Sequence, residues 1–175
     1  MAKNLEFKVR YRSLDLLLPK LADLKAKQQE TINQVDTYFH NPKGRLKLRE
    51  TDASDEGWLI YYERPNTLES RYSIYQLCKI DESSVLRELL TSALGVKTII
   101  KKQRVLWMYQ NTRIHLDTVE DLGEFVELET VYQGQSDADA NQEHNHVKNI
   151  LGLERAEPIA VSYSELPKHK ITEKI

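Results

Sequence analysis

The chain has 175 residues, a formal net charge of −2 and 30% charged side chains. That length is typical of a single domain, here residues 1–175, which can bury roughly 70% of its unfolded surface. The near-neutral charge argues against nucleic acid as a partner, so an anion site must come from local clustering of basic residues. No apolar segment approaches the ~20 residues that span a bilayer, and charges interrupt the N-terminus, so neither a membrane span nor a signal peptide is expected. With one cysteine, Cys78, the sequence predicts a soluble, cytoplasmic protein.

The chain divides into segments with the two-residue period of a strand and segments with the spacing of an amphipathic helix. The expected elements, in chain order, are a strand at 4–12, a helix of about 15 residues after Ser13, strands at 34–40, 45–51, 58–64 and 69–77, a helix at 82–94, strands at 97–109, 112–119 and 124–133, and a helix at 137–151. Pro19 is unfavourable inside the first helix and indicates a break or a late start. Eight strands in hairpin order predict a mainly β (α+β) fold, an eight-stranded antiparallel barrel covered outside by amphipathic helices.

Several of the expected strands carry charged residues along one face and apolar residues along the other. Because the helices are expected to cover the apolar faces, the charged faces should line the inside of the barrel. The basic residues with this parity are Lys8, Arg10, Arg12, Arg45, Lys47, Arg49, Arg64, Arg71, Lys102, Arg104 and Arg113. Any one of them could lie on a solvated sheet face, but the complete set favours a charged, tunnel-like lumen.

Buried cations at this density repel one another strongly unless anions compensate them. Arginine binds phosphate oxygens through two parallel hydrogen bonds, and lysine adds a point charge. A lumen with these residues is therefore suited to a polyphosphate.

Four carboxylates share the same parity: Glu6, Asp117, Glu127 and Glu129. Glu127 and Glu129 lie on one strand face, roughly 6–7 Å apart, which suits oxygen ligation of Mg²⁺ or Mn²⁺. A Glu-x-Glu pair alone is a weak signal and gains weight only from the other two carboxylates. His115, between Arg113 and Asp117, is as consistent with a structural role as with a catalytic one.

Seven segments carry a resemblance to a known family. They are Asn4-Leu5-Glu6-Phe7-Lys8, Asp36-Thr37-Tyr38-Phe39, Gly44-Arg45-Leu46-Lys47-Leu48-Arg49-Glu50, Tyr62-Glu63-Arg64-Pro65, Lys102-Gln103-Arg104, Arg113-Ile114-His115-Leu116-Asp117 and Leu122-Gly123-Glu124-Phe125-Val126-Glu127-Leu128-Glu129. In this order they resemble the CYTH superfamily, or triphosphate tunnel metalloenzymes. That superfamily contains class IV adenylate cyclases, thiamine triphosphatases and inorganic triphosphatases.

The resemblance implies an eight-stranded tunnel enzyme that acts on a triphosphate with Mg²⁺ or Mn²⁺. The implied metal ligands are Glu6, Asp117, Glu127 and Glu129. The implied triphosphate-binding residues are Lys8, Arg45, Lys47, Arg49, Arg64, Arg71, Lys102, Arg104 and Arg113. We take Glu6, Lys8, Glu127 and Glu129 as the candidate catalytic residues. The implied partner is a small molecule such as ATP, thiamine triphosphate or inorganic tripolyphosphate.

One position departs from the family pattern, whose N-terminal signature is Glu-x-Glu-x-Lys. Asn4 stands at the first glutamate, and its neutral oxygen is a weaker ligand for a cation. A nucleotide- or polyphosphate-binding protein with little or no catalysis is therefore the alternative to an enzyme. The residues expected to line the lumen are the same for a cyclase and for a hydrolase. A cyclase directs a ribose 3′-oxygen at the α-phosphate, whereas a hydrolase directs water at the terminal phosphate.

Overall fold

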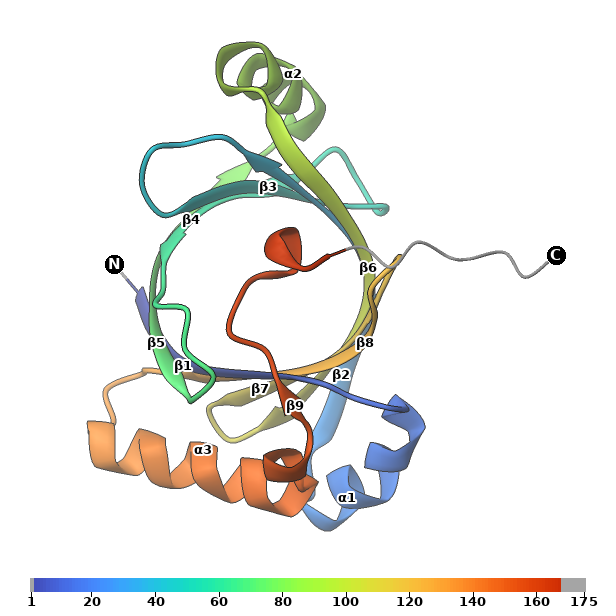
Figure 1. Ribbon diagram of the computed structural model, residues 1–175, viewed down its shortest axis with the longest axis vertical. Helices are drawn as coiled ribbons and strands as arrows, with labels where there is room; N and C mark the ends of the chain where they lie inside the picture. The colour runs from blue at the N-terminus through green and yellow to red at the C-terminus, as the bar shows by residue number, and fades with distance from the viewer. Residues whose placement is uncertain (1, 168–175) are drawn as a thin grey trace, which may run out of the picture.

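The computed structural model describes residues 2–167 and shows a closed antiparallel barrel with helices on its outside (Figure 1). The strands are β1 (Ala2–Arg10), β2 (Lys27–Phe39), β3 (Arg45–Thr51), β4 (Gly57–Glu63), β5 (Arg71–Ile80), β6 (Val96–Tyr109), β7 (Thr112–Val119), β8 (Gly123–Val131) and β9 (Glu157–Pro158). Their order is β5-β4-β3-β2-β6-β7-β8-β1-β9, and pairing of β5 with β1 closes the sheet. The predicted eight-stranded barrel is thus confirmed, and the short β9 pairs with the end of β1.

The helices are α1 (Leu18–Asp23), α2 (Ser83–Leu94) and α3 (Asp137–Leu151), with short 3₁₀ helices η1 (Leu14–Leu17), η2 (Leu153–Arg155) and η3 (Tyr163–Glu165). The prediction of about 15 helical residues after Ser13 was wrong in length, because η1 has four residues and α1 has six, but the late start indicated by Pro19 is confirmed, since the α-helix begins only at Leu18. Pro19 lies in the first turn of α1, where its missing N–H costs nothing. The helix ends before Lys25, which has a positive φ of 58°. From Lys27 onward the chain pairs with the long strand β6, and this partner overrides the local helical spacing.

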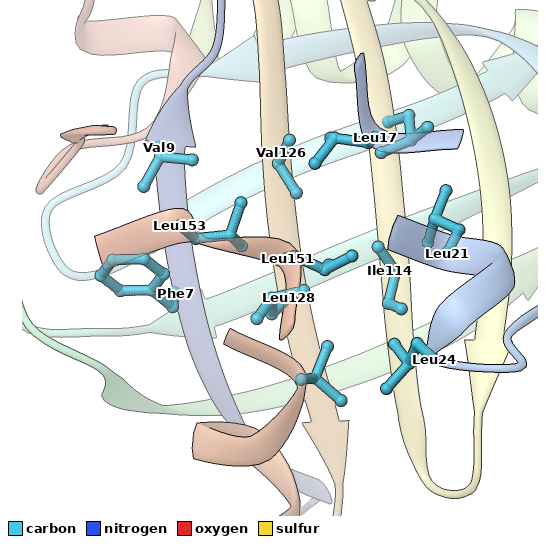
Figure 2. Close-up of a cluster of buried hydrophobic side chains, with 12 residues drawn as sticks. Phe7, Val9, Leu17, Leu21, Leu24, Ile114, Val126, Leu128, Leu151 and Leu153 are labelled. Atoms are coloured by element: carbon cyan, nitrogen blue, oxygen red, sulfur yellow. The ribbon is translucent and has the colours of Figure 1, made fainter. Parts of the chain in front are cut away.

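The main hydrophobic core lies on the outside of the barrel wall. It consists of Phe7, Val9, Leu17, Leu21, Leu24, Ile114, Leu116, Val126, Leu128, Val147, Leu151 and Leu153. Figure 2 shows Leu151 and Leu153 lying over the strand that carries Val126 and Leu128. η1, α1 and α3 therefore cover β1, β7 and β8, as expected. α2 differs, because its Val85 and Leu89 are 50% and 62% exposed.

A second apolar cluster fills one end of the barrel interior. It consists of Tyr38, Ile60, Tyr62, Ile100, Val119, Leu122, Phe125, Ile159 and Tyr163. The segment that carries β9 and η3 runs across the barrel opening in Figure 1, and the ring of Tyr163 packs edge-on against Phe125 at 5.0 Å between centroids. This C-terminal segment forms a floor beneath the charged part of the lumen.

Burial in the outer core gives a stability prediction. Leu128 is fully buried, so Leu128→Ala should leave a cavity and lower the free energy of unfolding by about 2–5 kcal/mol. Leu89→Ala on α2 is the control, and we expect it to change stability by less than about 1 kcal/mol, because Leu89 is 62% exposed. Urea denaturation of both variants measures this difference, and equal losses would contradict the placement of the core.

Candidate active site

A cavity of about 280 Å³ lies inside the barrel above the floor. Seven basic side chains line it: Lys8, Lys47, Arg49, Arg64, Lys102, Arg104 and Arg113. Three carboxylates line it as well: Glu6, Glu127 and Glu129. The strand parity inferred from the sequence therefore brings most of the expected residues together, from β1, β3, β6, β7, β8 and the end of β4.

The other predicted cations lie elsewhere. Arg45 and Arg71 line a second cavity, which shares Arg64 with the first. Arg45 is held by the Glu165 carboxylate at 2.9 Å, and Arg71 donates to the carbonyl oxygens of Thr67 and Ile159.

Two further cations expected in the lumen do not line the charged cavity within residues 2–167. Arg10 donates to the carbonyl oxygen of Leu122 and lies over the ring of Phe125. The expectation for Arg12 was wrong, because β1 ends at Arg10 and Arg12 is exposed.

Asp36 on β2 is the centre of a cation cluster that the sequence analysis did not single out as part of the site. Its carboxylate lies 2.8 Å from Lys47 Nζ, 3.0 Å from Lys102 Nζ and 2.7 Å from Arg49 Nε. Burial alone would raise the pKa of Asp36, but Arg49, Lys102 and Lys47 together hold it well below its usual value. Asp36 therefore remains charged and fixes three cations on one wall. Its parity with Tyr38, which also faces the lumen, was the signal that could have revealed it.

A second network joins β1, β6, β7 and β8. Arg104 binds both oxygens of Asp117, at 2.7 and 2.6 Å, and donates to Glu127 at 2.9 Å, while Lys8 Nζ lies 3.0 Å from the other Glu127 oxygen. The hydroxyl of Tyr163 donates to Asp117 at 2.8 Å, linking the C-terminal floor to the network.

These partners explain the charge state of Asp117. Burial opposes ionisation, but the adjacent Arg104 lowers the pKa of Asp117 to about 2. Asp117 is fully buried and is not among the described residues that line the cavity. Its contacts position Arg104.

The third ion pair joins Glu6 to Arg64, with Arg64 Nη1 at 2.6 Å from Glu6 Oε2. Burial raises the pKa of Glu6, and Arg64 partly offsets this. Within residues 2–167, the buried Nε and Nη2 of Arg64 have no hydrogen-bond partner. A buried donor without a partner is costly, so these N–H groups favour an acceptor supplied by a ligand in the cavity.

The donors of a candidate metal site lie at the cavity wall, where Glu127 and Glu129 line the cavity and His115 lies beside them without lining it. Ligand atoms of His115, Glu127 and Glu129 all lie within 4.8 Å of one another. His115 Nδ1 lies 3.6 Å from Glu127 and 3.9 Å from Glu129, and it has no hydrogen-bond partner in the described residues. Burial, followed by Arg104, lowers the pKa of His115 and favours the neutral imidazole that binds metals. Two carboxylates with one imidazole fit a divalent cation such as Mn²⁺.

Asn4 faces the same cavity from β1. It is 4% exposed, and its Oδ1 has no hydrogen-bond partner in the described part of the chain. It therefore presents an acceptor oxygen to the cavity where the family pattern has a carboxylate.

The two lysines on Asp36 titrate near neutrality. Burial, reinforced by Arg49, lowers the pKa of Lys47 to about 8. Burial lowers the pKa of Lys102 to about 7, because its pairing with Asp36 only partly compensates. Burial, with a smaller contribution from the neighbouring cations, thus makes proton loss from these groups easier than from a lysine in water.

The closed barrel with a charged lumen defines the class of protein, and comparison with known proteins identifies the family. Residues 2–163 match the CYTH domain. The chain therefore belongs to the CYTH domain family. A search of curated proteins found no significant match. The helices of residues 2–167 are each too short or too polar to cross a bilayer.

Solved structures share this fold. A protein from Pyrococcus horikoshii superposes with a TM-score of 0.82 at 22% identity, covering 93% of this chain and 98% of that chain. A candidate adenylate cyclase from Vibrio parahaemolyticus gives a TM-score of 0.72 at 17% identity, with 93% and 95% covered. A candidate adenylyl cyclase from Hippeastrum, described as having a dominant triphosphatase activity, gives 0.64 at 14% identity, with 94% and 93% covered.

The lowered pKa of Lys102 predicts a pH dependence of stability. The folded-state pKa of about 7 lies below the unfolded value of 10.5, so between these values the unfolded chain binds more protons and stability rises with pH. Lys102→Met should remove this contribution, up to about 1.4 kcal/mol per pH unit. Lys97→Met, at an exposed lysine, is the control. Urea denaturation between pH 7 and 9 measures the slopes, and the same slope in wild type and Lys102→Met would contradict the assignment.

Proposed function

We propose that this protein catalyses divalent-metal-dependent phosphoryl chemistry on a triphosphate-containing small molecule bound inside the barrel. The observation that carries the proposal is the convergence of seven basic side chains and three carboxylates on one interior cavity. Membership of the CYTH family supports it, as do the adenylate cyclase and triphosphatase descriptions of structural relatives. The implied substrates are ATP, thiamine triphosphate or inorganic tripolyphosphate.

The basic residues would bind the phosphate oxygens. Arg64 contributes two N–H groups with no partner among the described residues, and Arg113 is 43% exposed at its side chain. Asp36 holds the donor atoms of Lys47, Arg49 and Lys102 at about 3 Å, and phosphate oxygens could bind the remaining N–H donors of these three cations. Arg45 and Arg71 would extend the path into the second cavity through Arg64.

The carboxylates would hold Mg²⁺ or Mn²⁺. Glu127 and Glu129 line the cavity with His115 next to them, and Glu6 and Asn4 line the same cavity. A divalent ion there would neutralise charge on the phosphates and polarise the phosphoryl group. Asp117 would act by positioning Arg104, whose guanidinium also touches Glu127. Lys8, paired with Glu127, would add charge next to the reacting phosphate.

The residues of the cavity serve a cyclase and a hydrolase equally. A cyclase directs the ribose 3′-oxygen at the α-phosphate with pyrophosphate as the leaving group, whereas a hydrolase directs water at the terminal phosphate. Both reactions need the triphosphate fixed and its charge neutralised, and the same cations and metal do this in either case. Identification of the released product separates them.

Asn4 favours one alternative, a protein that binds a nucleotide or polyphosphate with little or no turnover. Its amide oxygen supplies no charge, so a metal at this side of the cavity would be held more weakly than by a glutamate. Glu6, Glu127 and Glu129 remain for one cation, which is why we place catalysis first.

The test is an assay of phosphate, pyrophosphate and cyclic nucleotide release from the three substrates, each with Mg²⁺ and with Mn²⁺. We expect metal-dependent turnover in the wild type and a loss of at least tenfold in Glu129→Gln, because a metal ligand is removed. Tripolyphosphate should still raise the melting temperature of that variant, since the cations remain.

Glu154→Gln, at an exposed site outside the cavity, is the matched control and should keep wild-type activity. Full metal-dependent turnover in Glu129→Gln would contradict the metal assignment. A wild type that is stabilised by tripolyphosphate but converts none of the three substrates would establish the binding-only alternative.

A further inference from the structure

The wall of the lumen is divided into a charged part and an uncharged part. The charged side chains come mainly from β1, β3, β6, β7 and β8, whereas the inward positions of β4 and β5 carry aliphatic, aromatic and small side chains between Arg64 and Arg71 at one end and Lys79, opposite Trp58 and paired with Glu56, at the other. The uncharged residues that line the cavity on these two strands are Trp58, Ile60, Tyr62, Ser73, Tyr75 and Leu77. Ile60, Tyr62 and Tyr75 also pack in the apolar cluster inside the barrel, whereas Trp58 and Leu77 belong to neither apolar cluster of the described residues.

Strand register makes the apolar wall directly continuous with the cations. Trp58 lies opposite Arg49 on β3, and Ile60 lies opposite Lys47 on β3 and opposite Leu77 on β5. Phosphates bound to Arg49 and Lys47 would therefore lie next to Trp58 and Ile60. Any group attached to such a phosphate chain has this wall within its reach.

The apolar wall is also incompletely covered by the protein. Ile60 is 9% exposed, but Trp58 is 42% exposed and Leu77 is 53% exposed. A single exposed apolar residue is normal on a protein surface. Two large ones that line the same cavity as seven cations are different, because an amphipathic cavity matches an amphipathic ligand.

We infer that the substrate is an organic triphosphate whose organic part carries a planar aromatic ring, and that Trp58 is the residue on which this ring stacks. This inference rests on the proposed function and narrows its substrate class. Stacking of a base on an aromatic side chain strengthens binding by roughly 5- to 150-fold. Inorganic tripolyphosphate has nothing to place on this wall, so the cavity should bind it through the cations alone. Leu77 and Ile60 would flank the ring.

The chain offers a direct reporter of this contact. It has two tryptophans, and Trp107 packs against the outer hydrophobic cluster, on the other side of the wall. Trp107→Phe therefore leaves Trp58 as the only tryptophan and also serves as the control for a loss of tryptophan outside the lumen. In this variant, ATP or thiamine triphosphate should quench the fluorescence, whereas tripolyphosphate should leave it largely unchanged.

Affinities for ATP, thiamine triphosphate and tripolyphosphate are then measured by calorimetry in EDTA, which stops metal-dependent turnover. Trp58→Ala should weaken binding of the ring-bearing triphosphate about tenfold and leave tripolyphosphate affinity unchanged. Trp58→Phe should keep most of the affinity that Trp58→Ala loses, because phenylalanine still offers an aromatic ring. Trp107→Phe should bind all three ligands as the wild type does. Comparison of ATP with thiamine triphosphate shows which ring the wall accepts.

The binding measurements distinguish the stacking role of Trp58 from the triphosphate site itself. Equal effects of Trp58→Ala on all three ligands, or none, would overturn the stacking role while leaving the triphosphate site in place. Tighter binding of tripolyphosphate than of both organic triphosphates would likewise overturn the inference. A wild type that binds none of the three, in EDTA or with Mg²⁺, would remove the proposed function itself and this inference with it.

Discussion

The structure depends on the pairing of buried cations with buried carboxylates inside the barrel. Removing one partner from a buried ion pair costs about 3–5 kcal/mol, because the other charge is left uncompensated. Here Asp36 pairs with Lys47, Arg49 and Lys102, and Glu6 pairs with Arg64. These contacts allow a closed barrel to keep its charged strand faces inward. They also hold the cations in fixed positions around one cavity, which is the preorganisation that binding of an anion requires.

The remaining architecture supports this charged interior. Because many inward positions carry charged side chains, the main hydrophobic core lies on the outer face, where α1 and α3 pack on β1, β7 and β8. The C-terminal segment closes one end with Ile159 and Tyr163 and extends the charge network through the bond from Tyr163 to Asp117. A polyphosphate would bind cation donors that have no partner among the described residues, such as Nε and Nη2 of Arg64, and a divalent metal would bind beside Glu127, Glu129 and His115. Each ligand would offset the charge of the other, so binding of each should favour binding of the other.

The barrel could be predicted from the sequence because the features that indicate it, strand parity and turn residues, can be recognised within short segments of the chain. The parity of Lys47, Arg49 and Glu129 correctly indicated an inward face. What it could not show is which charges meet across strands, because register joins residues far apart in the chain, as with Asp36 and Lys102. For the same reason, His115 was not recognised as a neighbour of both Glu127 and Glu129. The first helix was overestimated because the chain turns at Lys25, which has a positive φ, and pairs with β6 from Lys27 onward.

The central claim is that the charged lumen binds a triphosphate together with a divalent metal. A crystal structure of the protein with tripolyphosphate and Mn²⁺, including anomalous diffraction from manganese, tests it most directly. The account predicts phosphate density in contact with Arg49, Lys102 and Arg64, and a manganese peak beside Glu127, Glu129 and His115. Phosphate found only in the second cavity at Arg45 and Arg71, or manganese bound away from these ligands, would contradict it.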